Sequence, residues 1–240
     1  MTRLLFLEDA YRDEASAEVV GHTDRGGVVL TESLFYATSG GQPGDRGALI
    51  WEGGEMAVAT TVKAEDGAPV LVPEDGAALP PVGTEVSQRI DRTLRQGHMR
   101  VHTALHLLSV VIPLPVTGGS ISPAKGRLDF DMETPPEDKA ALEEALNALV
   151  ARDLAVTDEW ITEAELDANP GLVKTMSVQP PRGAGRIRLV RIADGAGTVD
   201  LQPCGGTHVK RTGEIGRLRL GKIEKKGARN RRVYIHLDEG

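Results

Sequence analysis

The sequence predicts an α+β fold, in which a β-rich N-terminal part precedes a part with both helices and strands. Three observations support this. Short runs rich in β-branched residues, separated by Gly, Asp and Pro, fill residues 1–88. Apolar residues with a helical period occur between residues 99 and 170, and strand-like runs return after residue 186. We place the domain boundary near residue 90 and expect domains 1–89 and 90–240.

The N-terminal part is expected to form a small barrel or sandwich. Its clearest strand candidates contain β-branched residues between turn residues and lie at 17–22, 27–30 and 57–62. A stretch with three prolines and two glycines at 72–83 is predicted to be a loop.

The C-terminal part is expected to contain three helices. The first covers 99–111, and the second opens near Glu137, directly after two prolines. A capping-box pattern of Thr162 and Glu165 opens a short third helix, which Pro170 ends. Strands are then expected at 186–192, 198–201, 217–220 and 232–237.

Composition limits the class of protein. Of the 240 residues, 40% are hydrophobic, which is enough for a core, but only 3% are aromatic, so aliphatic side chains must fill it. No apolar run approaches the roughly 18–20 residues of a membrane span, and the first residues lack the apolar segment of a signal peptide. The single cysteine excludes an intrachain disulfide and fits a reducing compartment. We therefore expect a cytoplasmic protein without membrane contact.

A basic segment near the C-terminus is conspicuous because the formal net charge of the chain is −7. Glu224 is the only acid among its basic residues, which are Lys222, Lys225, Lys226, Arg229, Arg231 and Arg232. One interpretation is a solvated strand–loop–strand with ordinary surface charges. Clustering on an otherwise acidic chain favours a surface that contacts phosphates.

Four potential metal ligands lie in two pairs, about a hundred residues apart in the sequence. His102 and His106 are four residues apart, so on a helix their imidazoles share a face. Cys204 and His208 form the second pair, and the two glycines between them allow a tight turn. Thiolate and imidazole are ligands that zinc prefers. His98 also lies four residues before His102, but it follows a glycine at the expected helix entrance, so we prefer His102 and His106.

This spacing predicts a metal site but leaves its purpose open. Four protein ligands are typical of a closed structural site, whereas a catalytic site keeps one position for water or substrate. The alternative to a metal site is a buried free cysteine with unrelated histidines.

A glycine-rich segment at 38–47 follows a strand-like run at 34–36. Backbone N–H groups of such a loop can bind a phosphate or a ribose. The segment has neither the G-K-[ST] of a P-loop nor a G-x-G-x-x-G that opens a helix. Taken alone, it is more simply interpreted as a hairpin with bulges.

Three motifs taken together resemble a known family. S-G-G-Q-P-G-D-x-G, H-M-R-x-H-T-A-x-H-L-L and D-x-x-P-C-G-G-T-H-V occur here in the order and spacing of the editing domain of alanyl-tRNA synthetase. The chain resembles more closely the free-standing relatives of that domain, the AlaX family of alanyl-tRNA editing proteins. Matching stretches also occur at 116–120, 126–131 and 225–233. We expect the medium-length form, which lacks a C-terminal tRNA-recognition extension.

The resemblance implies a small, β-rich, barrel-like N-terminal domain, followed by an α+β editing domain with helices packed on a mainly antiparallel sheet. It implies hydrolysis of the ester in mischarged tRNA(Ala), chiefly seryl-tRNA(Ala) and in some members glycyl-tRNA(Ala). It also implies a Zn2+ ion held by His102, His106, Cys204 and His208. Gly118 and Gly119 stand where some synthetase editing domains carry a Gln, so substrate contacts there are not transferable.

Other candidate site residues follow from this resemblance. Thr103, next to a ligand, and Thr38, in the glycine-rich segment, are the candidate catalytic residues, which would recognise a seryl hydroxyl or the substrate backbone. Alternatively, Thr103 caps the helix or faces the core, and Thr38 is a turn residue. Contacts with the acceptor end of tRNA(Ala) are expected from Gly40, Gly41, Gln42, Lys225, Lys226, Arg229 and Arg231. No stable protein partner is implied.

Two functions compete with a trans-editing hydrolase. One is a tRNA-binding module with a purely structural zinc ion, and the other is a zinc hydrolase of a small ester or amide.

Overall fold

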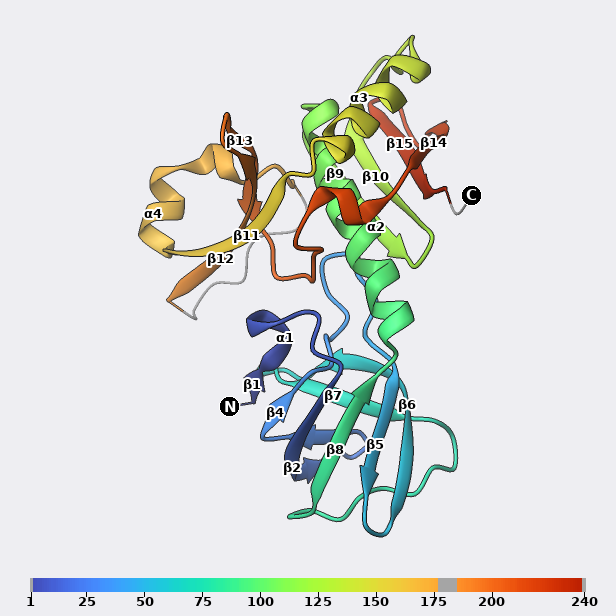
Figure 1. The fold of residues 1–240 in the computed structure, drawn as a ribbon, viewed down its shortest axis with the longest axis vertical. Helices are drawn as coiled ribbons and strands as arrows, with labels where there is room; N and C mark the ends of the chain where they lie inside the picture. The colour runs from blue at the N-terminus through green and yellow to red at the C-terminus, as the bar shows by residue number, and fades with distance from the viewer. Residues whose placement is uncertain (1, 177–184, 239–240) are drawn as a thin grey trace. The chain divides into compact units, whose positions relative to one another are not determined.

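The computed structural model describes residues 2–176 and 185–238 (Figure 1). The chain forms two compact units, Met1–His98 and Met99–Gly240, and helix α2 (Arg92–Val111) belongs partly to each. The expected division into domains 1–89 and 90–240 stays a prediction. No helix within the described ranges is long and apolar enough to cross a membrane.

The first unit contains a closed barrel of six strands, which confirms the barrel-like expectation. The strands are β2 (Glu14–His22), β3 (Val28–Leu30), β5 (Gly47–Trp51), β6 (Gly54–Lys63), β7 (Pro69–Pro73) and β8 (Glu85–Ile90). Their order is β2–β3–β7–β6–β5–β8, and neighbouring strands are antiparallel. Alternate side chains of β2 point into a core in which Val19, Leu30 and Leu49 are fully buried. The unit also contains β1 (Arg3–Leu4), α1 (Leu5–Glu8) and β4 (Glu32–Ser33).

The run at 34–36 is not a strand, so the expectation of one was wrong. Its residues are buried, but side chains rather than a neighbouring strand satisfy its backbone donors. Leu34 N–H donates to Gln88 Oε1 (2.9 Å), and Tyr36 N–H donates to Asp45 Oδ2 (2.6 Å). Because these partners replace a sheet ladder, an extended apolar segment can lie in the core outside the barrel strands.

In the second unit, the residues that the structure describes form two antiparallel sheets. Its strands are β9 (Val116–Ser122), β10 (Lys125–Asp131), β11 (Ala155–Thr162), β12 (Arg186–Asp194), β13 (Gly197–Pro203), β14 (Leu218–Lys225) and β15 (Asn230–Leu237). The four-stranded sheet has the order β14–β15–β10–β9, and the three-stranded sheet has the order β11–β12–β13. The four expected strands correspond to β12–β15, with somewhat different ends.

The two later helices are confirmed as α3 (Lys139–Ala151) and α4 (Glu163–Ala168). Helix α3 begins two residues after Glu137, because the Asp138 side chain accepts a hydrogen bond from Ala141 N–H (2.8 Å) and caps the helix. The predicted capping box of Thr162 and Glu165 opens α4. The described residues of this unit also form two short 3-10 helices, η1 (Pro170–Leu172) and η2 (Thr212–Ile215).

Helix α2 starts at Arg92 rather than at residue 99. Asp91 Oδ1 accepts a hydrogen bond from Leu94 N–H (2.9 Å), so an aspartate cap opens the helix earlier than its apolar pattern indicates. His98 therefore lies inside α2 and not at its entrance, which corrects the expectation. The expected loop at 72–83 also starts late, because its first two residues belong to β7.

Helices pack on the antiparallel sheet, as expected (Figure 1). Helix α2 approaches β10 at Gly126, where a Cβ atom would lie only 2.6 Å from Val101 Cγ1. Helix α3 is joined to β14 by two hydrogen bonds, from Asn147 Nδ2 to Leu218 O (2.8 Å) and from Leu218 N–H to Asn147 Oδ1 (2.9 Å). The α+β class is thus confirmed. Because Gly126 has no side chain, α2 can pack closely against the sheet.

Candidate metal centre

The two predicted ligand pairs meet in the second unit. His102 and His106 project from α2, and Cys204 and His208 lie just after β13. Their four potential ligand atoms all lie within 4.8 Å of one another. The three histidines are buried and Cys204 is partly buried. The structure therefore assembles the four-residue group that the spacing indicated.

The spacing of the donor atoms fits a tetrahedral metal ion. Bonds of about 2.0–2.1 Å to nitrogen and about 2.3 Å to sulfur would place a sulfur and a nitrogen about 3.5 Å apart. Cys204 Sγ lies 3.5 Å from His102 Nε2 and 3.2 Å from His208 Nε2. Little movement is needed for these atoms to surround one ion.

The loop that carries Cys204 is shaped by Arg188 of β12. Arg188 Nη1 donates to the carbonyl oxygens of Cys204 (3.1 Å) and Gly206 (2.9 Å), which draws the loop into a turn. Gly206 N–H in turn lies 3.4 Å from Cys204 Sγ, where it stabilises a thiolate. The loop thus presents sulfur in the form that binds a metal.

A carboxylate orients His106. His106 Nδ1 lies 2.9 Å from Asp200 Oδ2, and Gln202 Nε2 donates to the same oxygen (2.8 Å). An ionised carboxylate only accepts hydrogen bonds, so Nδ1 carries the proton and Nε2 is left for a metal. The contact joins residues 94 positions apart.

A hydroxyl orients His208 in the same way. Thr103 Oγ1 donates to Met99 O (2.9 Å), so its lone pairs face His208 Nδ1 (3.1 Å) and Val209 N–H (3.3 Å). His208 then donates from Nδ1 and offers Nε2 to the centre. The fully buried Thr103 hydroxyl is thus a partner of a ligand. Its expected contact with substrate stays a prediction.

Electrostatics set the protonation states in the cluster. Burial would raise the pKa of the Cys204 thiol, but the neighbouring imidazoles, His102 first, hold it well below its usual range. Burial and the charge of His102 lower the pKa of His208 to about 3. Burial opposes a charged His106, yet hydrogen bonds with Asp200 and Cys204 raise the pKa of His106 to about 9. The Cys204 thiolate and the neutral His208 are therefore in the form that binds a metal, whereas His106 must release one proton to bind it.

The predicted glycine-rich segment forms a tight turn in the first unit. Ser39 N–H donates to Gln42 O (3.1 Å), Gln42 N–H donates to Ser39 O (2.9 Å), and between them Gly40 and Gly41 have φ of 56° and 85°. Thr38 Oγ1 donates to a barrel carbonyl (Thr61 O, 3.1 Å) and accepts from Gly44 N–H (2.8 Å). Gly40 and Gly41 are exposed, whereas the Gln42 side chain is buried.

The basic segment forms the β14–β15 hairpin, and most of its charges are paired. Glu224 binds both Lys222 and Lys226, the latter at 3.0 Å. Arg229 pairs with Asp131 at 3.1 Å. Lys225 is exposed to solvent.

Two arginines of this segment have structural partners. Arg231 is buried and donates to four carbonyl oxygens, including those of Glu133 and Gly227. Arg232 forms a bidentate pair with Asp129 (2.8 and 2.9 Å). Arg231 and Arg232 therefore hold the hairpin, while Lys225 and Lys226 are exposed, and contact of this segment with phosphates stays a prediction.

Sequence reasoning missed three residues around the centre. Asp200 and Gln202 lie within D-x-x-P-C-G-G-T-H, and the regular appearance of a carboxylate or carbonyl behind a ligating histidine could have singled them out. Lys174, which contacts Asp200, follows no local pattern. His98, the rejected alternative, lies one turn before His102, outside the group of four.

Two family models match the chain. The model of tRNA synthetases class II (A) matches residues 6–94, and the model of the threonyl and alanyl tRNA synthetase second additional domain matches residues 187–234. The second match includes Cys204 and His208 and the basic residues between 222 and 232.

Full-length relatives agree with these matches. An alanyl-tRNA editing protein AlaX-M of Methanosarcina acetivorans is 35% identical over 99% of both chains, and one of Saccharolobus solfataricus is 33% identical over 98% of both. An alanine–tRNA ligase of Caldivirga maquilingensis is 35% identical over 93% of this chain. The chain spans about a quarter of the length of that ligase.

Proposed function

Because the chain belongs to the AlaX-M family of alanyl-tRNA editing proteins, we propose that it is a trans-editing hydrolase that deacylates mischarged tRNA(Ala). Seryl-tRNA(Ala) is the expected main substrate and glycyl-tRNA(Ala) the second. The observation that carries the proposal is the convergence of four ligand atoms within 4.8 Å, contributed by the motifs that this family shares.

Editing solves a problem that a single binding pocket cannot. A pocket for alanine rejects glycine only by the loss of one methyl group, and it rejects serine only by one added hydroxyl. Each difference is worth about 1–3 kcal/mol at most, which is less than translation requires. A second site that hydrolyses the wrong ester supplies the missing discrimination.

We propose that the metal is zinc. A zinc ion in this centre would act as a Lewis acid on the ester carbonyl or on a water, and would fix the aminoacyl end. The chain's part is to hold the ion with His102, His106, Cys204 and His208. Thr103 and Asp200 fix the direction of two of these ligands. The single cysteine fits a reducing compartment, so we place the protein in the cytoplasm.

For tRNA, we propose that Lys225 and Lys226 contact phosphates of the acceptor stem. Lys225 is exposed, and the Lys226 side chain is 40% exposed beside Glu224, so both ammonium groups can exchange water for phosphate. Binding should weaken as salt rises, because phosphate neutralisation releases counterions. The double charge reversal of Lys225→Glu with Lys226→Glu should lower affinity for tRNA at low salt. Lys139→Glu, at the exposed start of α3, is the control for reversal of a lysine charge elsewhere in the unit.

One observation favours a second candidate. Four convergent protein ligands are typical of a closed structural zinc site. A tRNA-binding module with such a site would bind tRNA(Ala) and leave its ester intact. Deacylation therefore distinguishes the two functions.

The test is deacylation of seryl-, glycyl- and alanyl-tRNA(Ala) by the purified protein with its metal content measured. We expect rapid loss of serine, slower loss of glycine and retention of alanine. His106→Ala should lose metal and activity together, whereas His236→Ala, on β15 and outside the ligand group, should keep both. Full activity and full metal content in His106→Ala would show the ligand assignment to be wrong. A metal-loaded protein that binds tRNA(Ala) but hydrolyses none of the three esters would leave only the binding module.

A further inference from the structure

Lys174 lies in a segment that is fixed against the four-stranded sheet. Val116 N–H, at the start of β9, donates to Lys174 O (3.0 Å), and Met176 N–H donates back to Val116 O (2.8 Å). Thr175 and Val116 form an isolated parallel bridge. The backbone of Lys174 is therefore held in place on both sides.

The Lys174 side chain reaches from this segment to the metal centre. Its ammonium contacts Asp200 Oδ1, while Asp200 Oδ2 accepts from His106 Nδ1 (2.9 Å) and Gln202 Nε2 (2.8 Å). The Asp200 side chain is fully buried, whereas Lys174 keeps 28% of its side chain exposed. Contacts thus run without a break from a partly exposed lysine to a metal ligand.

Asp200 has a partner on each of its oxygens. A buried carboxylate without a partner is strongly unfavourable, and removal of one member of a buried pair costs several kcal/mol. Asp200 Oδ2 faces His106 and Gln202, and Oδ1 faces the Lys174 ammonium. By holding Oδ1, Lys174 keeps the other oxygen directed at His106.

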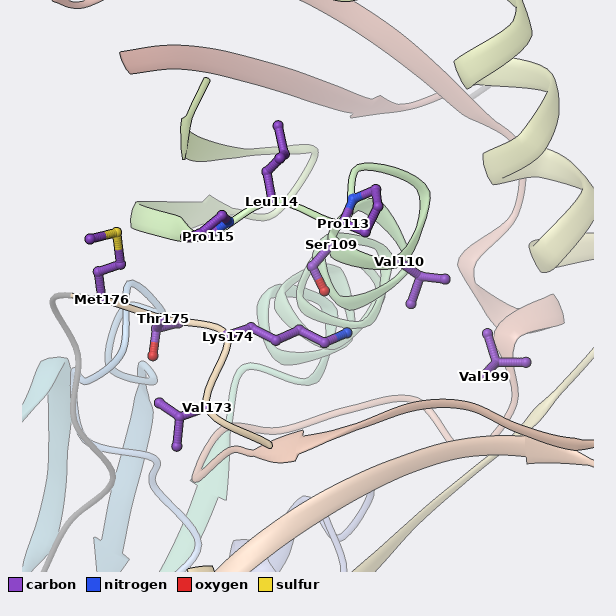
Figure 2. Close-up of a pocket in the computed structure, with 10 residues that line it drawn as sticks. All are labelled: Ser109, Val110, Pro113, Leu114, Pro115, Val173, Lys174, Thr175, Met176 and Val199. Carbon is purple, nitrogen blue, oxygen red and sulfur yellow. The ribbon is translucent and has the colours of Figure 1, made fainter. Parts of the chain in front are cut away.

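Lys174 is also accessible from a cavity of about 610 Å³ (Figure 2). Ser109 and Val110 of α2, Val199 of β13 and the 173–176 segment line it, together with Leu114 and the prolines beside it. In Figure 2 the lysine ammonium points toward Ser109 and Val110. Because the side chain borders open space, its truncation enlarges a cavity and does not leave a void in a packed core.

We propose that Lys174 is a positioning residue for the metal centre. Through Asp200 it fixes the orientation of His106, and so it sets the affinity of the site for zinc. The proposal rests on the metal assignment made under the proposed function, but it concerns metal binding and needs no tRNA hydrolysis.

The test compares Lys174→Ala and Lys174→Arg with the parent protein. Zinc affinity is measured by competition with a chromophoric chelator, and ligand geometry by the visible absorption spectrum of the cobalt-substituted protein. Loss of a partner behind a metal ligand typically lowers affinity by about 10–100-fold. We expect about a 10-fold loss and an altered cobalt spectrum for Lys174→Ala, and recovery of most of the affinity for Lys174→Arg. Asp200→Asn should lose at least as much as Lys174→Ala.

The control is Arg152→Ala, which removes another partly exposed cation of the same unit from its carboxylate, Asp194. It should leave zinc affinity and the cobalt spectrum unchanged. Unchanged affinity and spectrum in Lys174→Ala would overturn the proposal. Lys174→Ala could also lose zinc affinity together with a fall in the urea midpoint of the zinc-free protein, and Lys174→Arg could recover neither. That result would overturn the proposal, since the lysine would then only stabilise the fold. Failure of deacylation with normal zinc binding would instead refute the hydrolase function.

Discussion

Gly126→Ala should destabilise the second unit, although it adds a single methyl group. The new Cβ would lie 2.6 Å from Val101 Cγ1 and 3.2 Å from both Leu105 methyl groups. Val101 is fully buried and Leu105 nearly so, so neither can swing into solvent. Helix α2 must then move away from β10, and overpacking of this kind costs about 1–3 kcal/mol. For a protein of this size, the loss corresponds to a fall in Tm of about 3–9 °C.

The assay is urea and thermal denaturation followed by circular dichroism at a fixed zinc concentration, because bound metal adds to apparent stability. Gly195→Ala is the matched control, since a Cβ there meets nothing within 4 Å. Since α2 carries two ligands, zinc affinity should fall in Gly126→Ala and not in Gly195→Ala.

A double-mutant cycle tests the cause. Val101→Ala alone should cost about 2 kcal/mol, because it deletes buried methyl groups. In combination with Gly126→Ala it also removes the nearest colliding atom, so the double mutant should be more stable than the two single losses together predict. If the losses add to within about 0.3–0.5 kcal/mol, the proposed collision does not exist.

Three further predictions concern other contacts. Burial raises the pKa of Asp129, but its two arginine partners lower this pKa overall. The carboxylate therefore contributes its full stability above the pKa of an unfolded aspartate, about 3.9, and this contribution is lost as the pH falls through the pKa of the folded protein. Asp129→Asn should thus cost about 1–3 kcal/mol at pH 7 and less at pH 3 in urea denaturation; an equal cost at both pH values would contradict this. Asp45→Asn leaves the buried Arg95 with its charge unbalanced and should cost about 3–5 kcal/mol, nearly independent of salt; strong salt dependence would indicate an exposed pair. Thr103→Val should lower zinc affinity about 10-fold and Thr103→Ser should restore it, whereas full affinity in Thr103→Val with lost deacylation would assign the hydroxyl to substrate.

Local patterns predicted much of the second unit and less of the first. The capping box at Thr162 and the helical spacing of His102 and His106 depend on neighbours within one or two turns, and the structure contains both. The start of α2 was misjudged because Asp91, an aspartate cap outside the apolar pattern, opens the helix. The run at 34–36 was misjudged because its partners are the side chains of distant residues such as Gln88.

The sequence by itself determined the family and predicted the group of four potential ligands. A lone cysteine, three histidines at helix and turn spacing, and three motifs in order are properties of residue identity, which no folding step changes. Only the tertiary structure decided which side chains stand behind the ligands. Asp200 meets His106 across 94 positions, Thr103 meets His208 across 105, and Lys174 meets Asp200 from a separate segment. Such contacts depend on how α2 and the two sheets pack, because side-chain periodicity specifies the face that a residue occupies and not the residue opposite it.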